Sequence, residues 1–174
     1  MKEKNEKEKK KLPKWVIIVT IVLFVLLFGC LFMVYCFNKF FLGYKIDNKN
    51  ASASNCLKAV NTYVIEAYEK NGKQIPTDRE YIVKGNGQNI EASELVAESG
   101  SCDYLPRQKK LYWAVKFRDG VPCEAWCCYR PIKDGELRYY SRDEQVEIYN
   151  KNVMKNGKNV IGYCNAKDGV NYFH

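Results

Sequence analysis

Residues 15–37 have the sequence WVIIVTIVLFVLLFGCLFMVYCF, which contains no charged side chain. At roughly 1.5 Å per residue, an α-helix of this length would extend about 34 Å. A bilayer core is about 30 Å thick, so a slightly tilted helix would cross it. A helix in a soluble core would keep one polar face, and this stretch has none. We therefore predict one transmembrane helix over residues 15–37, with Trp15 and Tyr35 as aromatic anchors near its ends.

The charges on either side of this stretch predict its orientation. Residues 1–14 form a basic tail with a net charge of +4. Its three glutamates are outnumbered by seven lysines, Lys2, Lys4, Lys7, Lys9, Lys10, Lys11 and Lys14. Close to the other end of the stretch lie only Lys39, Lys45 and Lys49. Positive residues gather on the cytoplasmic side of a membrane, so we expect a single-pass protein of the cell membrane with its N-terminus in the cytoplasm and its C-terminal domain outside.

Three short motifs bear on the processing of the chain. Ala51-Ser52-Ala53 has the form of a signal peptidase site, but it follows the apolar run by more than a dozen residues. Leu27-Phe28-Gly29-Cys30 resembles a bacterial lipobox, but the residues after Cys30 stay apolar. Asn50-Ala51-Ser52 matches the N-glycosylation pattern of eukaryotic secretory proteins. We expect the apolar helix to remain as an uncleaved signal anchor.

The cysteines beyond the span predict disulfides. There are six of them, all on the side predicted to be outside: Cys56, Cys102, Cys123, Cys127, Cys128 and Cys164. An even number in an oxidising compartment indicates disulfide bonding. Cys127 and Cys128 should have different partners, because neighbouring side chains on a strand point to opposite faces. The pairings that we expect join Cys102 to one of the cysteines at 123, 127 and 128, and Cys56 to Cys164.

The chain beyond the span begins with a predicted linker and a helix. Residues 38–53 are expected to be the linker, because Asn, Lys, Ser and Gly interrupt the apolar pattern. Residues 54–174 would form the disulfide-containing extracytoplasmic domain. Ser54 is a suitable helix N-cap, and Lys70-Asn71-Gly72 supplies a stop. The residues that recur at helical spacing, and so predict a face packed on a sheet, are Leu57, Val60, Val64, Ala67 and Tyr68.

The rest of the domain is predicted to be mainly an antiparallel sheet. We expect strands over residues 81–83, 112–117, 124–130, 137–140, 160–163 and 170–173, and a short helix over residues 92–98. The turn signals are Asp119-Gly120, Asp134-Gly135, Asn156-Gly157 and Asp168-Gly169, which are typical of tight hairpins. Trp113 and Trp126 should lie across from one another on adjacent strands, and one of Tyr139 and Tyr140 should be exposed. The fold class is α+β, with a single N-terminal transmembrane helix before a small helix-plus-sheet domain.

That order of elements resembles the exposed domain of type IV pilin-like proteins and pseudopilins. Residues 55–100 carry the resemblance, with the amphipathic helix, its exit at residues 71–76, and the stretch Ile90 to Val96. Lys14-Trp15-Val16-Ile17-Ile18 at the start of the span contains neither the cleavage site nor the glutamate of a prepilin. The resemblance implies a pilin-like ectodomain on a plain anchor, with a protein partner in an envelope assembly, and does not imply polymerisation.

The side chains that carry chemistry favour a protein without catalytic activity. The only histidine is His174, so a nucleophile paired with a histidine base is not expected. Cys123, Cys127 and Cys128 lack the CxxC spacing of zinc knuckles, and no cofactor or metal is predicted. The carboxylates Asp143, Glu144 and Glu147 lie in a run of mixed charge, as on a solvated face.

We therefore expect a membrane-anchored, non-catalytic binding or assembly component of unknown process. The alternative is a membrane-tethered hydrolase or thiol-redox enzyme. Residues 38–174 contain 21 basic and 17 acidic side chains, a balance that does not suggest binding to nucleic acid.

Overall fold

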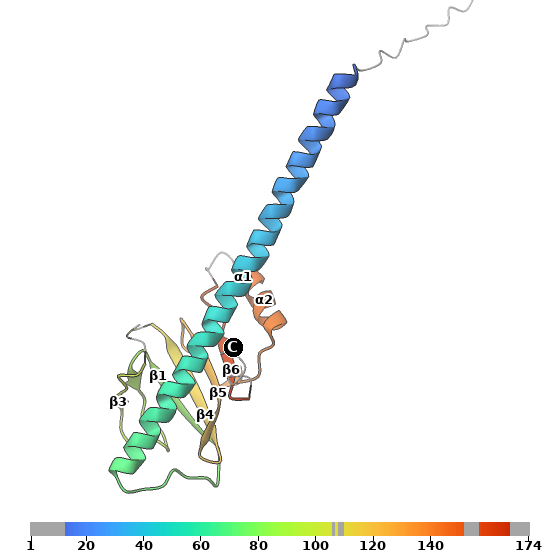
Figure 1. Ribbon diagram of the computed structural model, residues 1–174. Helices are drawn as coiled ribbons and strands as arrows, with labels where there is room; N and C mark the ends of the chain where they lie inside the picture. The colour runs from blue at the N-terminus through green and yellow to red at the C-terminus, as the bar shows by residue number, and fades with distance from the viewer. Residues whose placement is uncertain (1–12, 106, 108–109, 152–156, 168–174) are drawn as a thin grey trace, which may run out of the picture. The chain divides into compact units, whose positions relative to one another are not determined.

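The computed structural model describes residues 13–105, 107, 110–151 and 157–167 (Figure 1). The chain divides into two compact units between Phe41 and Leu42. One helix, α1 (Lys14–Lys70), contributes residues to both units. The second unit also contains strands β1 to β6, a short 3₁₀ helix η1 (Asp134–Glu136) and helix α2 (Arg142–Lys151).

The first unit contains the predicted span, which is helical throughout. Its large apolar side chains are exposed, and Trp15 and Tyr35 are 66% and 64% accessible. The hydroxyl of Thr20 donates to the carbonyl of Val16 at 2.8 Å, so this polar group is satisfied within the helix. By length and composition, α1 is the one helix in the described part of the chain that is long and apolar enough to cross a membrane. The structure thus contains a helix with the length and composition that the predicted span requires.

Residues 38–53, which the sequence suggested as a linker, are helical and belong to α1. Ile46 and Ala53, two helical turns apart on the same face of α1, are fully buried in the second unit. Ser54 therefore lies inside the helix and does not cap it. The predicted end of the helix is correct. Gly72 has φ of 61°, and the amide of Lys73 donates to the carbonyl of Tyr68 at 3.0 Å, as in a Schellman motif.

The strands of the second unit form one six-stranded antiparallel sheet in the order β3-β2-β1-β4-β5-β6. The strands are β1 (Tyr81–Asn86), β2 (Asn89–Ile90), β3 (Gly100–Ser101), β4 (Tyr112–Arg118), β5 (Val121–Cys128) and β6 (Gly162–Asn165). Within this unit, α1 runs across one face of the sheet (Figure 1). The α+β prediction is therefore confirmed.

Two tight turns have the backbone that their sequences favour. Asp119 and Gly120 have φ of 54° and 75°, so the β4–β5 hairpin has the positive φ values of a type I′ turn. Gly87, with φ of 56°, is the first central residue of the two-residue β1–β2 hairpin. Its carbonyl accepts a hydrogen bond from the indole of Trp113 at 2.9 Å. The prediction at Asp119-Gly120 is confirmed.

Two predicted elements are wrong. Residues 92–98 form no helix, with bends at 94–98, and residues 137–140 form no strand. Asp134-Gly135 opens the 3₁₀ helix η1 in place of a hairpin turn. In η1 the Glu136 carboxylate accepts from the backbone amide of Lys133 at 2.9 Å, and this side-chain contact closes the turn locally without a second strand. The strand predicted at 170–173 and the turn at Asp168-Gly169 lie outside the described residues.

The sheet is buried on both faces. The face beneath α1 carries a core that includes Val83, Trp113, Val115, Phe117 and Cys127. The opposite face carries a smaller core with Ala114, Trp126, Cys128, Tyr140, Ile161 and Tyr163. The two tryptophans are on adjacent strands, but Trp113 pairs with Cys127 and Trp126 pairs with Ala114. They therefore pack on opposite faces and not against each other. Tyr139 is 62% exposed and Tyr140 is 6% exposed, as predicted.

Candidate functional site

A pair of amide side chains joins α1, α2 and β6 in the second unit. Asn50 Nδ2 donates to Gln145 Oε1 at 3.1 Å, and Gln145 Nε2 donates to Asn50 Oδ1 at 2.7 Å. Gln145 Nε2 also donates to the carbonyl of Ile161 at 2.8 Å. Asn50 Oδ1 accepts in addition from the amide of Tyr163 at 2.9 Å. We call this group, made of Asn50, Gln145, the Ile161 carbonyl and the Tyr163 amide, the amide clasp.

The amide clasp is a core feature. Gln145 is 1% exposed and is the one polar residue classed as buried among the described residues. The burial of such an amide requires that its donors and acceptors be paired, and the clasp pairs them. The clasp also occupies Asn50 Nδ2, the atom that a glycan would take in the Asn50-Ala51-Ser52 motif. Glycosylation at Asn50 is therefore incompatible with this packing.

Lys49 lies beside the clasp and fastens the segment before β6 to α1. Its Nζ donates to the carbonyls of Gly157 and Val160, both at 2.9 Å, and lies 5.1 Å from the ring centre of Tyr129. Burial lowers the pKa of Lys49, against a smaller opposing effect of Cys128. The ammonium group is thus satisfied by backbone oxygens and an aromatic face.

The contact between α1 and β6 depends on a glycine. A Cβ on Gly162 would lie 2.3 Å from the carbonyl oxygen of Lys49 and 2.8 Å from Sγ of Cys127. Gly162 pairs with Cys127 across β5 and β6. The absence of a side chain there allows the helix backbone to approach the strand closely.

The structure holds all eight cysteines as free thiols, so none of the expected disulfides is present in it. It does bury several of the cysteines that we expected to pair within the same core. Cys56, Cys102, Cys127 and Cys164 belong to the core beneath α1, whereas Cys128 belongs to the core on the opposite face. Cys123 is half-buried on β5, with its thiol directed at the carbonyl of Lys116. The expected separation of Cys127 from Cys128 is confirmed, and a bond between Cys102 and Cys128 would have to cross the sheet.

Burial raises the pKa of four of these thiols. It raises the pKa of Cys56 to about 12, with a smaller contribution from Cys102. It also raises the pKa of Cys127 well above the usual range, and that of Cys102 and Cys123 to a lesser degree. Since the thiolate is the nucleophile, these groups are poorly suited to redox catalysis in the folded domain.

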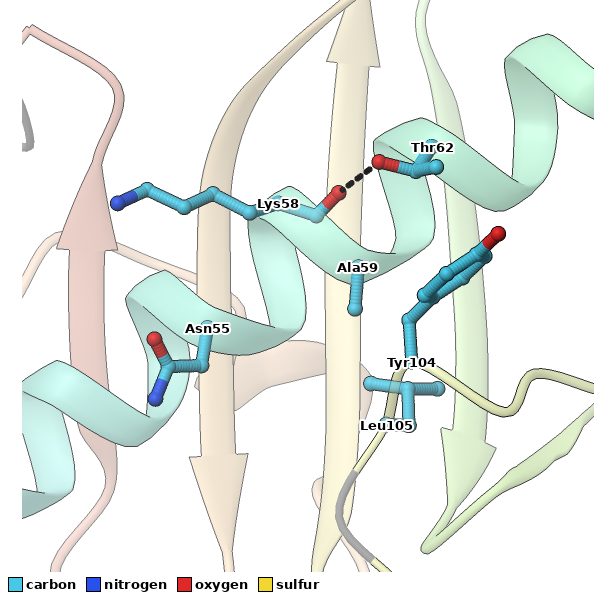
Figure 2. A pocket seen from close by; sticks show the side chains of 6 residues that line it. All are labelled: Asn55, Lys58, Ala59, Thr62, Tyr104 and Leu105. Atoms are coloured by element: carbon cyan, nitrogen blue, oxygen red, sulfur yellow. Dashed lines mark hydrogen bonds between the residues drawn. The ribbon is translucent and has the colours of Figure 1, made fainter.

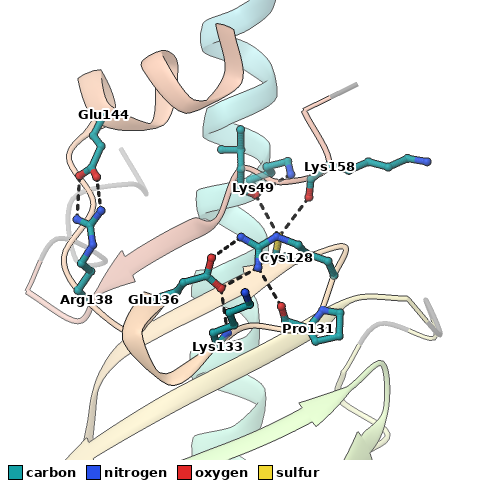
Figure 3. A network of polar contacts seen from close by, with 10 residues as sticks. Lys49, Cys128, Pro131, Lys133, Glu136, Arg138, Glu144 and Lys158 are labelled. Atoms are coloured by element: carbon teal, nitrogen blue, oxygen red, sulfur yellow. Dashed lines mark hydrogen bonds and ion pairs between the residues drawn. The ribbon is translucent and has the colours of Figure 1, made fainter. Parts of the chain in front are cut away.

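Two carboxylates of the acidic run in α2 are engaged in ion pairs. Glu144 pairs with Arg138, as Figure 3 shows, and Glu147 pairs with Lys151 one turn along the helix. The hydrogen bond from Arg138 lowers the pKa of Glu144. In the described chain no group of three histidine, cysteine or acidic side chains is arranged to hold a metal ion. These carboxylates belong to a charged surface, as the sequence suggested.

Another ion pair stabilises the segment after β5. Arg130 forms a forked contact with Glu136, with its NH1 group 2.7 Å from Oε2. Glu136 also accepts from the backbone amide of Lys133 (Figure 3). The contact with Arg130 lowers the pKa of Glu136. On the other side of this segment, the Cys128 thiol donates to the carbonyl of Lys158 at 3.2 Å.

A shallow groove of about 480 Å³ lies along α1, open to solvent. Figure 2 shows its lining, which consists of Asn55, Lys58, Ala59, Thr62, Tyr104 and Leu105. Tyr104 is exposed, and its hydroxyl donates to Glu66 at 2.8 Å. The groove offers one cation and several small polar groups, and it holds no pair of groups suited to acid–base chemistry.

Comparisons with protein families, with curated proteins and with solved structures returned no match.

Proposed function

We propose that this chain is a membrane-anchored protein whose C-terminal unit lies outside the cytoplasm and serves as a non-catalytic binding or assembly component. The observation that carries the proposal is the composition of α1 along its length. Its first part exposes apolar side chains on all sides, and its last part supplies Leu57, Val60 and Val64 to the core beneath it. One helix thus combines a membrane anchor with the central helix of a folded domain.

The pilin-like character of the domain is part of the proposal. A long apolar helix, whose C-terminal part packs across an antiparallel sheet, is compatible with that fold. We infer that the exposed unit contacts a protein partner in an envelope assembly. The groove along α1, with the exposed Tyr104 at its edge, is the candidate surface for that contact, since tyrosine is enriched in protein interfaces.

Two observations favour binding over catalysis. Glu144 and Glu147 of α2 form ion pairs with Arg138 and Lys151, and the contact with Arg138 lowers the pKa of Glu144. The buried thiols of Cys56 and Cys127 have raised pKa values, which disfavours the thiolate that redox chemistry needs. A membrane-tethered hydrolase or thiol-redox enzyme therefore has less support than a binding protein.

The orientation is tested with the full-length chain in membrane vesicles. Tags at the two termini are exposed to protease with the membrane intact and after it is opened. We expect the C-terminal tag to be accessible from the extracytoplasmic side and the N-terminal tag from the cytoplasmic side. The opposite pattern, or a chain recovered in the soluble fraction, would refute the anchored topology.

The binding role is tested by crosslinking from the groove. A photoreactive amino acid replaces Thr62, which lines the groove, and in a matched variant it replaces exposed Tyr139, which does not. A protein crosslinked from position 62 and not from position 139 supports the proposal. Equal crosslinking from both positions, or from neither, contradicts the groove as the contact surface.

A further inference from the structure

The thiols of Cys56 and Cys127 lie against the same turn of α1. Cys127 Sγ donates to the carbonyl oxygen of Lys49 at 3.2 Å. In an α-helix that carbonyl points toward residue 53, four positions on. A helical side chain leans toward the N-terminus and covers the turn before its own Cα. Cys56 therefore covers the turn at residues 52–53, which is where the Cys127 thiol lies.

The other candidate partners of Cys56 meet different parts of the fold. Cys102 Sγ lies 3.8 Å from the carbonyl oxygen of Ala59, which points toward residue 63. That oxygen is about 15 Å farther along α1 than the Lys49 carbonyl that Cys127 contacts. Cys164 pairs with Ala125, two residues along the sheet from the Cys127–Gly162 pair. Cys128 is on the opposite face. Charge effects connect Cys56 to both thiols, because in addition to burial Cys56 raises the pKa of Cys127 and Cys102 raises that of Cys56, so the position along α1 decides between them.

We propose that Cys56 and Cys127 form a disulfide that ties α1 to the centre of the sheet. The inference rests on the proposed function, because it requires the second unit to mature in an oxidising space. Each thiol loses its proton, one S–S bond forms, and the two electrons reduce the disulfide of a thiol–disulfide exchange protein to two thiols. This pairing replaces the Cys56–Cys164 bond that the sequence suggested.

The bond has to form before the core closes. Cys56 and Cys127 are 0% and 1% exposed, so no oxidising protein reaches them in the folded domain. Burial also suppresses the thiolate that attacks a disulfide. Once formed, the bond is equally protected from reductants. The order of events is therefore oxidation during folding and then burial.

The bond is detected in the full-length protein isolated from membranes. Free thiols are blocked with N-ethylmaleimide in denaturant without reductant, and the chain is then digested with trypsin. Cys56 falls in the peptide 50–58, and Cys127 falls in the peptide 119–133 with Cys123 and Cys128. We expect these two peptides to be joined, and fragment ions between positions 127 and 128 to assign the link to Cys127.

Matched variants give an independent measurement. Cys56→Ala and Cys127→Ala should each release one additional free thiol and lower the melting temperature by roughly 10 °C, since the bond closes a loop of about 70 residues. Their combination should cost no more than either alone. Cys128→Ala, one residue away on the other face, should leave the 56–127 link in place.

Each outcome decides the matter. A link from Cys56 to any other cysteine overturns the pairing. So does the finding that N-ethylmaleimide blocks both Cys56 and Cys127 while other disulfides are present. Neither result contradicts the proposed topology. All six thiols blocked, together with a C-terminal tag on the cytoplasmic side, contradicts the proposed function itself. All six blocked with the tag outside overturns the disulfide alone.

Discussion

Removing the Gln145 side chain should destabilise the second unit by about 3 kcal/mol. In Gln145→Ala three hydrogen bonds disappear, two with Asn50 and one with the carbonyl of Ile161. A hydrogen bond of this kind contributes about 1 kcal/mol net, and a buried group left without a partner costs at least as much. The site is closed to water, because Gln145 is 1% exposed, so solvent does not replace the lost contacts.

The measurement is urea unfolding of the full-length chain in detergent, followed by tryptophan fluorescence. Trp113 and Trp126 are buried on the two faces of the sheet and report on its unfolding. A loss of about 3 kcal/mol should lower the urea midpoint by roughly 1–2 M, at a slope of about 2 kcal/mol per M. Gln74→Ala is the matched control, because Gln74 is exposed, and it should change stability by less than about 0.5 kcal/mol.

A double-mutant cycle separates the clasp from a simple loss of packing. Asn50→Ala removes the same two amide bonds and also the bond from the Tyr163 amide. The combined variant should therefore cost about 2 kcal/mol less than the sum of the single variants. Strict additivity, or a Gln145→Ala effect as small as that of Gln74→Ala, would refute the reasoning.

Three further outcomes follow from the structure. Gly162→Ala should lower the free energy of unfolding by more than about 2 kcal/mol, because its Cβ would meet the Lys49 carbonyl at 2.3 Å. Gly72→Ala, which has open space but φ of 61°, should cost only about 1 kcal/mol; equal effects in urea unfolding would contradict this account. The Arg130–Glu136 pair lowers the pKa of Glu136, so its contribution is complete above the ordinary glutamate value of 4.5 and is lost as the pH falls through the lower folded value. Wild type and Glu136→Gln should thus differ in stability at pH 7 and converge at strongly acidic pH, and a difference that persists in acid would disprove the assignment.

The sequence predicted the elements whose signals are local. The apolar span, the stripe Leu57, Val60 and Val64, and the Asp119-Gly120 turn each depend on residues close together in the chain, and each is present. The fold class followed from the change of period from helical to alternating residues. The burial of Cys127 and Cys128 on opposite faces likewise needed only the geometry of a strand.

Helix α2 shows why other elements were missed. Its residues are mostly polar, so no apolar stripe marks it, and it is fastened through Gln145, a residue that is usually exposed. One local signal was available. Ser141 and Glu144 have the spacing of a capping box, and the Ser141 hydroxyl accepts from the Glu144 amide at 3.2 Å. The clasp itself joins positions 95 residues apart, which no local pattern reveals.

The polar residues at 38–53 are the clearest case in which composition misled. Lysine, asparagine and aspartate suggested a linker, yet these are the side chains that bind the C-terminal part of the second unit. Lys49 holds Gly157 and Val160, Asn50 holds Gln145, and Asp47 pairs with Arg142 at 2.9 Å. A fragment beginning at Ser54 would therefore leave Gln145 buried without its partner, whereas one beginning at Leu42 keeps every one of these contacts. The folded unit begins at the first part of α1 whose side chains contact the rest of the unit. Long-range hydrogen bonds determine that boundary, and the hydropathy of the sequence does not reveal them.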